Sequence, residues 1–345
     1  MQIYNLPVHK RISTYIVDFF KETVQGATHY FLSHFHADHY HGLNSKFPEE
    51  IYCSPTTAAL IKLKFKIKTV ALEMFKEYEL ANGDTVKCIE AYHCPGAVCF
   101  IFKLKSQGYV LHTGDFRSTP EFLDSIRQYS FNTVYLDNTY EGFKSFGTQK
   151  EAIHRILRVM EDKYKLPVVV PLRICFLFCT YFVGKEKIFL SAAEYFKKKV
   201  KVTKEKKKVL DAFDEYSKKR LMEEIKTERD LLTKRDLSTE RDLSSLLTVD
   251  DHSEFMVIST QHCNKDSLNK LLLGNPADHV VVFCGTGWKD CVNKIDWKKA
   301  NGRIIKKGIE IHYIPYSEHS SSGELKSFLE TIKTKRIINT VKYKH

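Results

Sequence analysis

A dense group of side chains that can bind metal lies near the start of the chain. His34, His36, Asp38 and His39 follow the apolar run of residues 27–33. Alternate residues at the end of a strand face the same way, so His34 and His36 can bind one ion together. Asp38 and His39 lie past the bend and can face a second ion. Imidazole nitrogen with carboxylate oxygen suits zinc, with manganese or iron as substitutes. The alternative interpretation is a solvated polar loop.

Two further candidate ligands lie where strands are expected to end. His93 follows the strand-like residues 85–92, and Asp115 ends another such stretch. Active sites commonly take their ligands from the loops that follow strands. Each residue alone would be an ordinary polar side chain, but together with the cluster they indicate a metal site. His41 and His112 are left out because the spacing assigns them no face.

Short strands and one helix are expected to position these residues within the first 140 positions. Ser54 is a suitable N-cap and Pro55 suits the first position of a helix. The expected strands are 27–33, 51–54, 85–92, 97–105, 109–115 and 132–137, with a hairpin turn at 106–108.

From about Thr148 the pattern changes to alternating helices and strands. Residues 148–164 have apolar side chains at helical spacing and precede the apolar run 166–170. Within residues 227–245 a six-residue unit occurs three times. Three short units are too small to form a core, so they predict a low-complexity surface insertion.

The last part of the chain returns to strands and one helix. Strand-like residues lie at 279–288 and at 308–320, and Ser321 and Glu324 have the spacing of a capping box. This order of elements favours one domain inserted into another.

Composition limits the classes of protein that this chain can be. It has 345 residues, of which 43% are hydrophobic, enough to bury the core of one large domain or two ordinary ones. Its 54 basic and 42 acidic residues give a net charge of +12, which favours a polyanionic partner such as nucleic acid. Nine cysteines without a Cys-x-x-Cys pair predict reduced cysteines in an intracellular protein. The apolar runs are shorter than the roughly 18 residues of a membrane span, so no membrane contact is expected.

Five motifs occur in an order known from one group of nucleases: HFHADH, AYHCPGAV, HTGDFR, YLDNTY and IPYSEHSS. With them the chain resembles the metallo-β-lactamase-fold nucleases of the β-CASP branch. More narrowly it resembles the DNA cross-link repair subgroup that includes Artemis and Apollo. The motifs GKEKIFL, GTGW and PYSEHSS are most similar to the cross-link repair 5′ exonuclease of that subgroup.

The resemblance implies an α/β fold, in which an αββα metallo-β-lactamase sandwich carries an inserted β-CASP α/β domain. Residues 1–142 would form the first part of the metallo-β-lactamase domain. Residues 143–305 would form the inserted domain, and residues 306–345 the second, apparently truncated, part of the first domain.

The resemblance also implies a site for two zinc ions. The expected ligands of the first ion are His34, His36, His93 and Asp115. The expected ligands of the second ion are Asp38, His39, His319 and Asp115, so that Asp115 bridges the two. The residues expected to take part in catalysis are Asp38, Asp115, Asp137 and His319. Asp18 would support the ligand loop.

Two ions that share a carboxylate can lower the pKa of a bridging water and supply hydroxide near neutral pH. The same ions would polarise a phosphate and offset the charge that develops on it. A helix expected after His319 would favour a phosphate at its N-terminus. Lys185, Ser317 and Ser320 are further candidate phosphate contacts, with helix capping and solvation as the alternative roles.

The resemblance therefore implies a nuclear 5′-to-3′ DNA exonuclease that acts on 5′-phosphorylated ends in interstrand cross-link or double-strand-break repair. An RNA-processing endonuclease and a catalytically silent scaffold are the alternatives. Val341 falls where DNA-directed members are similar in carrying valine and RNA-processing members carry histidine.

The sequence departs from the family pattern at two places. Residues 171–179 are an apolar addition of nine residues that puts Cys179 where the subgroup has glycine. This addition predicts a longer buried strand, an exposed patch or an error in the gene model. The chain also ends four residues after Val341, so packing behind the site is expected to be incomplete.

Overall fold

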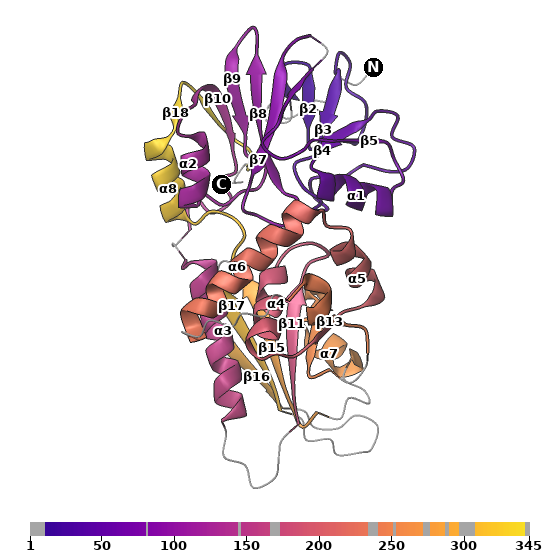
Figure 1. Ribbon diagram of the computed structural model, residues 1–345, viewed down its shortest axis with the longest axis vertical. Helices are drawn as coiled ribbons and strands as arrows, with labels where there is room; N and C mark the ends of the chain where they lie inside the picture. The colour runs from indigo at the N-terminus through magenta and orange to yellow at the C-terminus, as the bar shows by residue number, and fades with distance from the viewer. Residues whose placement is uncertain are drawn as a thin grey trace. The chain divides into compact units, whose positions relative to one another are not determined.

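The chain folds into two compact units in the computed structural model (Figure 1). The first unit comprises residues 1–145, 212–217 and 318–345, and the second comprises residues 146–211 and 218–317. The structure describes residues 11–80, 82–143, 146–165, 173–233, 241–250, 253–271, 277–286, 290–296 and 308–341.

The first sheet of the first unit carries the start of the histidine cluster. Its strands, in spatial order, are β1 (Arg11–Ile12), β2 (Tyr15–Val17), β3 (His29–Phe31), β4 (Ile51–Cys53) and β5 (Thr69–Ala71). Strands β2 to β5 are parallel, and β1 pairs antiparallel with β2. The ends of β2 and β3 therefore lie at the same edge of the sheet.

The second sheet of the first unit brings three strand ends together. Its strands are β6 (Glu77–Glu79), β7 (Thr85–Glu90), β8 (Val98–Leu104), β9 (Gly108–His112), β10 (Ser130–Leu136), β18 (Lys333–Thr334) and β19 (Ile337–Asn339). Both β7 and β9 are antiparallel to β8, and β9 is parallel to β10. Strands β7, β9 and β10 thus run the same way and end at one edge, as the candidate ligands require.

The two sheets of the first unit pack face to face around a shared aromatic core. Phe31 from the first sheet makes edge-to-face contacts with Phe100 and Phe102 from the second, and Tyr15 stacks on Phe102. Contacts of this kind add to the area that the rings bury.

Helices complete the layers of the first unit. Helix α1 (Pro55–Lys64) contacts β4 and β5, while α2 (Pro120–Ile126) and α8 (Ser322–Thr331) pack through Phe122 and Phe328 around Phe116 beside the second sheet (Figure 1). The first unit therefore has the expected αββα sandwich.

Three of the expected helix starts are confirmed. Ser54 caps α1 with Pro55 in its first turn, and Ser321 forms a capping box with Glu324 at α8. Helix α3 (Gln149–Tyr164) also begins with a capping box, made by Thr148. Helix α2 was not expected from the sequence, although Thr119 followed by proline is a helix-start signal of the same kind.

The second unit is built on one mostly parallel sheet. Its strands, in spatial order, are β13 (Leu247–Thr248), β12 (Val200–Lys201), β14 (Phe255–Ser259), β11 (Ile174–Thr180), β15 (His279–Thr286), β17 (Gly308–Pro315) and β16 (Cys291–Asp296). In addition to α3, the described helices of this unit are α4 (Glu186–Tyr195), α5 (Lys204–Asp211), α6 (Glu215–Thr233) and α7 (Lys265–Leu271). Helix α6 begins in the first unit.

The apolar addition supplies the central strand of this sheet. Residues 174–180 form β11, which pairs in parallel with β14 and β15 and is almost entirely buried. The longer buried strand is therefore the correct alternative for residues 174–179. The apolar run 166–170, expected to be the strand after α3, lies outside the described residues, as do 171–172.

Near the end of the chain, the boundary between the two compact units differs from the expected domain boundary. Strand β17 pairs along its whole length with β15 and also with β16. These hydrogen bonds attach residues 308–317 to the second unit, so the chain returns to the first unit between Ser317 and Glu318. The sequence analysis placed that return at residue 306.

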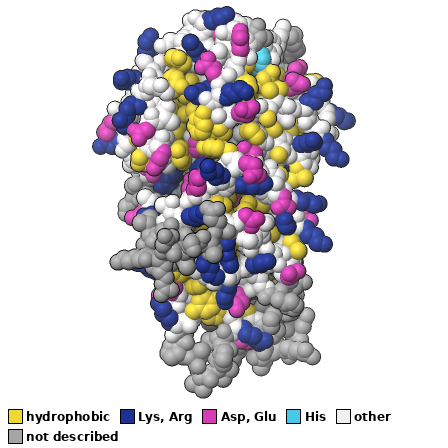
Figure 2. Space-filling model, viewed as in Figure 1, with side chains coloured by type: hydrophobic (Ala, Val, Ile, Leu, Met, Phe, Trp, Pro, Cys, Tyr) yellow, Lys and Arg dark blue, Asp and Glu magenta, His cyan; other side chains and the backbone are white. Residues whose placement is uncertain are grey.

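The described surface is mixed in charge. On the face shown in Figure 2, Lys and Arg side chains lie among Asp and Glu side chains. Part of the repeated segment 227–245 is helical, since α6 extends to Thr233, whereas residues 234–240 lie outside the described residues. Among the helices that the structure describes, none has the length and apolar character of a membrane span.

Candidate metal centre

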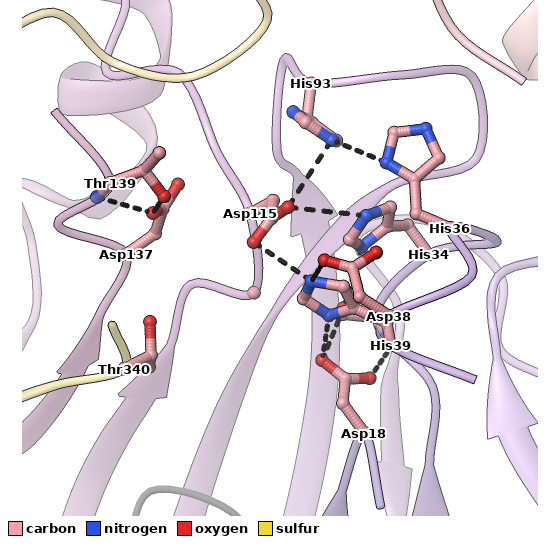
Figure 3. A network of polar contacts seen from close by, with 12 residues as sticks. Asp18, His34, His36, Asp38, His39, His93, Asp115, Asp137, Thr139 and Thr340 are labelled. Carbon is pink, nitrogen blue, oxygen red and sulfur yellow. Dashed lines mark hydrogen bonds and ion pairs between the residues drawn. The ribbon is translucent and has the colours of Figure 1, made fainter. Parts of the chain in front are cut away.

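The candidate ligands meet at the strand ends of the first unit. His34 and His36 follow β3, His93 follows β7, and Asp115 follows β9. Figure 3 shows Asp115 in the middle of this group, with interactions that reach His34, His39 and His93. Residues far apart in the sequence thus come together because the strands of both sheets end at this edge.

The first group of ligand atoms comes from His34, His36, His93 and Asp115, whose nearest nitrogen and oxygen atoms all lie within 4.8 Å of one another. His34 Nε2 and His93 Nε2 lie 3.6 and 3.7 Å from Asp115 Oδ2. His93 Nε2 lies 3.2 Å from His36 Nδ1. Four nitrogen and oxygen ligands at this spacing match the first predicted ion site.

A second group contains Asp38, His39 and Asp115, also within 4.8 Å. His39 Nε2 lies 3.1 Å from Asp115 Oδ1 and 3.7 Å from Asp38 Oδ2. Asp115 therefore uses one oxygen toward the first group and the other toward the second. This is the arrangement expected of a bridging carboxylate.

His319 approaches the same carboxylate from the segment between β17 and α8. Its Nε2 lies 3.7 Å from Asp115 Oδ2, and its Nδ1 donates to Asp137 Oδ2 at 2.9 Å. A third group of ligand atoms within 4.8 Å accordingly comprises Asp115, Asp137 and His319.

The protein fixes the orientation of these imidazoles through their Nδ1 atoms. His39 Nδ1 donates to Asp18, His93 Nδ1 to the Glu318 carbonyl and His319 Nδ1 to Asp137. The Nδ1 of His34 lies 3.0 Å from Ser33 Oγ, which itself donates to Asp18. In the neutral form of each ring, a proton on Nδ1 would leave the lone pair on Nε2 that metal ligation through Nε2 requires.

One unsatisfied atom fits a metal ion particularly well. His34 is completely buried, and its Nε2 has no hydrogen-bond partner among the residues that the structure describes. Burial and the neighbouring His39 hold the pKa of His34 well below its usual value, and burial and His319 do the same to the pKa of His93. Both rings are therefore neutral, which is the form that binds metal. The residues present thus fit a divalent metal site.

The other charged groups of the site are strongly coupled. Burial disfavours the ionised form of Asp115, but His39 and His319 outweigh it and hold the pKa of Asp115 well below its usual value. Burial would lower the pKa of His39, yet Asp115 and Asp18 raise it well above the usual value. Burial likewise opposes protonation of His319, and Asp137 and Asp115 raise its pKa to about 9. The Asp115 carboxylate is thus held ionised by its surroundings.

Asp18 holds the histidine loop against β3. Asp18 adopts a left-handed backbone conformation (φ 54°). Its carboxylate accepts hydrogen bonds from Ser33 N at 2.8 Å, Ser33 Oγ at 2.7 Å and His39 Nδ1 at 2.8 Å. Asp18 therefore contacts the loop that it was expected to support, and its supporting role stays a prediction.

We expect Asp18→Asn to weaken zinc binding by about 10- to 100-fold, because the amide has lost the charge and one oxygen that orient His39. Zinc titration against a competing chelator measures this change. The matched control is Asp84→Asn, since Asp84 is also buried and accepts from Tyr15 and Lys105 N away from the ligands. Equal zinc affinities for the two variants would contradict the supporting role of Asp18.

Gly114 permits the close approach of the Asp115 loop to β3. Its backbone is left-handed (φ +54°), and a Cβ atom there would lie 2.7 Å from Ser33 Cβ. We expect Gly114→Ala to lower the free energy of unfolding by more than about 1 kcal/mol and to weaken zinc binding, because Asp115 must shift. Thermal unfolding and zinc titration measure both effects.

Gly108→Ala is the control for backbone strain, because Gly108 lies at the start of β9 and the Asp115 loop follows its end. Gly108 also has a positive φ (+74°), but the nearest side-chain atom would lie 3.4 Å from the new Cβ. We expect this variant to lose stability and to keep its zinc affinity. A similar loss of zinc binding in both variants would show that contact with Ser33 is unimportant.

Asp137 lies beside the ligand groups in a positioning role. It is buried; its Oδ1 accepts from Thr139 N and Oγ1, and its Oδ2 accepts from Phe116 N and His319 Nδ1. The sequence analysis grouped Asp137 with the catalytic residues, whereas these contacts assign its oxygens to holding His319 and the neighbouring loops.

The candidate phosphate contacts are occupied inside the protein. Lys185 is only 5% exposed, and its Nζ donates to the Gly285 carbonyl. Ser317 is buried, and its carbonyl accepts from Gln149. Ser320 is buried, and its Oγ donates to the Phe116 carbonyl and accepts from Ser118 N. Ser320 thus anchors the loop that carries Asp115, a contact that differs from the predicted phosphate role.

Several residues that sequence reasoning missed support the ligands. Ser33 connects Asp18 with His34, and Thr139 holds Asp137. The Arg117 side chain pairs with Glu324 at 3.0 Å and so fixes the Asp115 loop to α8. Ser33 and Thr139 lie next to predicted motif residues, which is the signal that could have identified them.

The last described residues pack along β10 behind the site. Thr340 N donates to the Leu136 carbonyl, and Val341 N donates to Asn138 Oδ1. Strand β19 pairs in parallel with β10 just before them. Up to Val341, the segment behind the site is therefore hydrogen-bonded to the strand that leads into Asp137.

Comparisons with known proteins agree with this geometry. Residues 241–345 match the family described as DNA repair metallo-beta-lactamase. The chain is 32% identical over 352 residues to the DNA cross-link repair 1A protein of Gallus gallus, and 33% identical over 345 residues to that of Homo sapiens. These matches cover 97% of this chain and 32% and 30% of the relatives.

A plant relative is covered over more of its length. The DNA cross-link repair protein SNM1 of Arabidopsis thaliana is 30% identical over 354 residues, which are 97% of this chain and 66% of that protein. The chain thus spans about a third of the vertebrate relatives and more of the plant one. The resemblance carried by the five motifs is confirmed, and the chain belongs to the DNA repair metallo-β-lactamase family of cross-link repair proteins.

Proposed function

We propose that this chain is a metal-dependent DNA nuclease that degrades DNA in the 5′-to-3′ direction from a 5′-phosphorylated end. Its role would be in interstrand cross-link or double-strand-break repair in the nucleus. The observation that carries the proposal is the Asp115 carboxylate, whose two oxygens face two separate groups of ligand atoms. A pair of sites that share one carboxylate suits phosphodiester hydrolysis.

Two zinc ions are the proposed cofactors. His34, His36 and His93 would hold one ion, and Asp38 and His39 would hold the other (Figure 3). His319, whose Nε2 lies 3.7 Å from Asp115 Oδ2, is the further proposed ligand of the second ion. Bound there, such ions lower the pKa of a water molecule and offset the charge that develops on a phosphate during displacement. Nitrogen and oxygen ligands of this kind are common at catalytic zinc sites.

The protein's own residues prepare this site before substrate arrives. Asp18 and Asp137 fix two of the imidazoles, and Ser320 and Arg117 hold the loop that carries Asp115. Asp38 is different, because its side chain is 79% exposed. It is the proposed ligand that is most open to solvent and thus to an incoming substrate.

DNA is the proposed substrate for two reasons besides the site. The names of the relatives refer to DNA cross-link repair, and the net charge of +12 favours a polyanionic partner. Val341 at the end of the described chain adds support, because RNA-processing members of the resembling group carry histidine there.

The test uses a 3′-labelled single strand, made as DNA and as RNA, each with and without a 5′-phosphate. Purified zinc-loaded chain is incubated with each strand and the product lengths are resolved. Progressive shortening of phosphorylated DNA alone is the expected result. Internal cuts in RNA would favour an RNA-processing endonuclease instead. No cleavage of any strand by folded, zinc-loaded protein would favour a silent scaffold and contradict the proposal.

A further inference from the structure

A second group of metal-capable side chains lies in the second unit, far in sequence from the histidine cluster. Cys179, Cys263 and Cys284 place their sulfur atoms within 4.8 Å of one another. Cys179 comes from the end of β11, Cys284 from β15, and Cys263 from the turn after β14. The proposed nuclease chemistry uses none of them.

The sheet register explains why these thiols meet. Cys179 and Cys284 are directly paired residues on neighbouring parallel strands, so their side chains leave the same face of the sheet. Ile258 of β14 pairs with Cys179 on the other side. The chain passes from β14 through residues 260–262 to Cys263, which packs against the same apolar face.

The surroundings of the three thiols combine an apolar support with access to solvent. Cys179 and Cys284 are buried, and Leu177 and Val282 belong to the same apolar cluster. Cys263 is only partly buried, so an ion can reach the group from its side. Hydrogen bonds to Cys263 and Cys284, together with burial, raise the pKa of the Cys179 thiol. The Cys179 thiol is therefore protonated in the metal-free protein, and metal binding would release its proton.

We propose that Cys179, Cys263 and Cys284 form a second metal site, which binds one thiolate-preferring ion of the monovalent copper or zinc type. Three converging sulfur atoms select soft or borderline ions and exclude magnesium and calcium, which prefer oxygen. Cys179 contributes a ligand at the position where the resembling subgroup has glycine. The proposed site would therefore be a property of this chain rather than of the family pattern.

The test measures metal binding by the reduced, full-length chain under anaerobic conditions. In one arm the protein is titrated with Cu⁺ against a chromophoric chelator, and in the other with Zn²⁺. We expect wild type to bind one ion through thiolates, seen as sulfur-to-metal absorption, in at least one arm. Cys263→Ala should bind that ion at least about tenfold more weakly. The arm that gives the thiolate signal identifies the ion.

Cys291→Ala is the matched control, because Cys291 is also a partly buried cysteine but lies outside the group. It pairs with Tyr313 of β17, which pairs in turn with Cys284. It should bind the ion as wild type does. Equal binding by wild type and Cys263→Ala in both arms would overturn the proposal, and so would an equal loss in Cys291→Ala.

A measurement on wild type alone removes any doubt about folding of the variants. The chain is alkylated with and without the ion, and mass spectrometry reports the rate at each cysteine. Protection of Cys263 with no protection of Cys291 is the expected result. Equal protection of both cysteines, or of neither, would contradict the proposed site. Both outcomes are independent of nuclease activity, so they stand apart from the proposed function.

Discussion

Replacement of Asp115 by asparagine is expected to abolish DNA cleavage. The amide keeps the size of the side chain but loses the charge and one of the two oxygens that face His34, His39 and His93. Loss of metal-based stabilisation is worth several kcal/mol, and about 1.4 kcal/mol corresponds to a tenfold change in rate. Activity should therefore fall by roughly a thousandfold or more. The rate of shortening of labelled DNA measures it.

The matched control for this variant is Asp124→Asn. Asp124 lies on α2, its side chain is largely exposed, and its partner is Arg127 on the surface. This substitution should leave cleavage unchanged. Zinc content distinguishes the two causes of lost activity, since Asp115→Asn should also lower the amount of bound zinc. A variant that keeps full zinc and full activity would contradict the bridging role of Asp115.

Phe178→Ala is expected to have the largest effect on stability. Phe178 is fully buried in β11, stacks on Phe283 at 5.7 Å between ring centres and contacts Phe255 edge-to-face. Truncation of a buried phenylalanine lowers the free energy of unfolding by about 3–5 kcal/mol, because apolar surface and packing are lost. Amide hydrogen exchange of β11 and β15 measures this loss in the second unit itself.

Phe182→Ala is the comparison, because Phe182 lies two residues beyond β11 and is 48% exposed. Its effect should stay within about 0.5 kcal/mol. Similar exchange rates in the two variants would mean that residues 174–180 do not form the buried centre of the sheet.

The histidine cluster could be read from the sequence because it is local. His34 and His36 alternate shortly after a strand that was expected to extend over residues 27–33 and that ends at Phe31 in the structure. His93 and Asp115 follow strand-like residues, so their position at a sheet edge was also predictable. Their mutual distances were not, since these depend on how the two sheets face each other.

His319 shows where local patterns are insufficient. Its partner Asp137 is 182 residues away in the sequence. Only the resemblance to a known family placed both residues among the expected catalytic residues, and their hydrogen bond was not predicted. Lys185 shows the opposite case. A lysine in a polar motif suggested a phosphate contact, but the tertiary fold buries its amine against the Gly285 carbonyl. Burial of a single charged side chain depends on partners that the sequence around it does not name.

The fold of the second unit was the least predictable part. The apolar residues 171–179 were compatible with a longer buried strand, an exposed patch or an error in the gene model. A short apolar run has no periodicity that distinguishes a strand from a patch. Pairing with β14 and β15 decides the question. The return to the first unit was misplaced for a similar reason: residues 308–315 look like any strand, and only their pairing shows to which sheet they belong.

Anomalous X-ray scattering from crystals of the zinc-loaded chain tests the central claim most directly. The account predicts two zinc peaks on either side of Asp115. One peak should be coordinated by His34, His36 and His93, and the other by Asp38, His39 and His319. A single peak, or zinc bound away from Asp115, would contradict a two-ion site that shares this carboxylate.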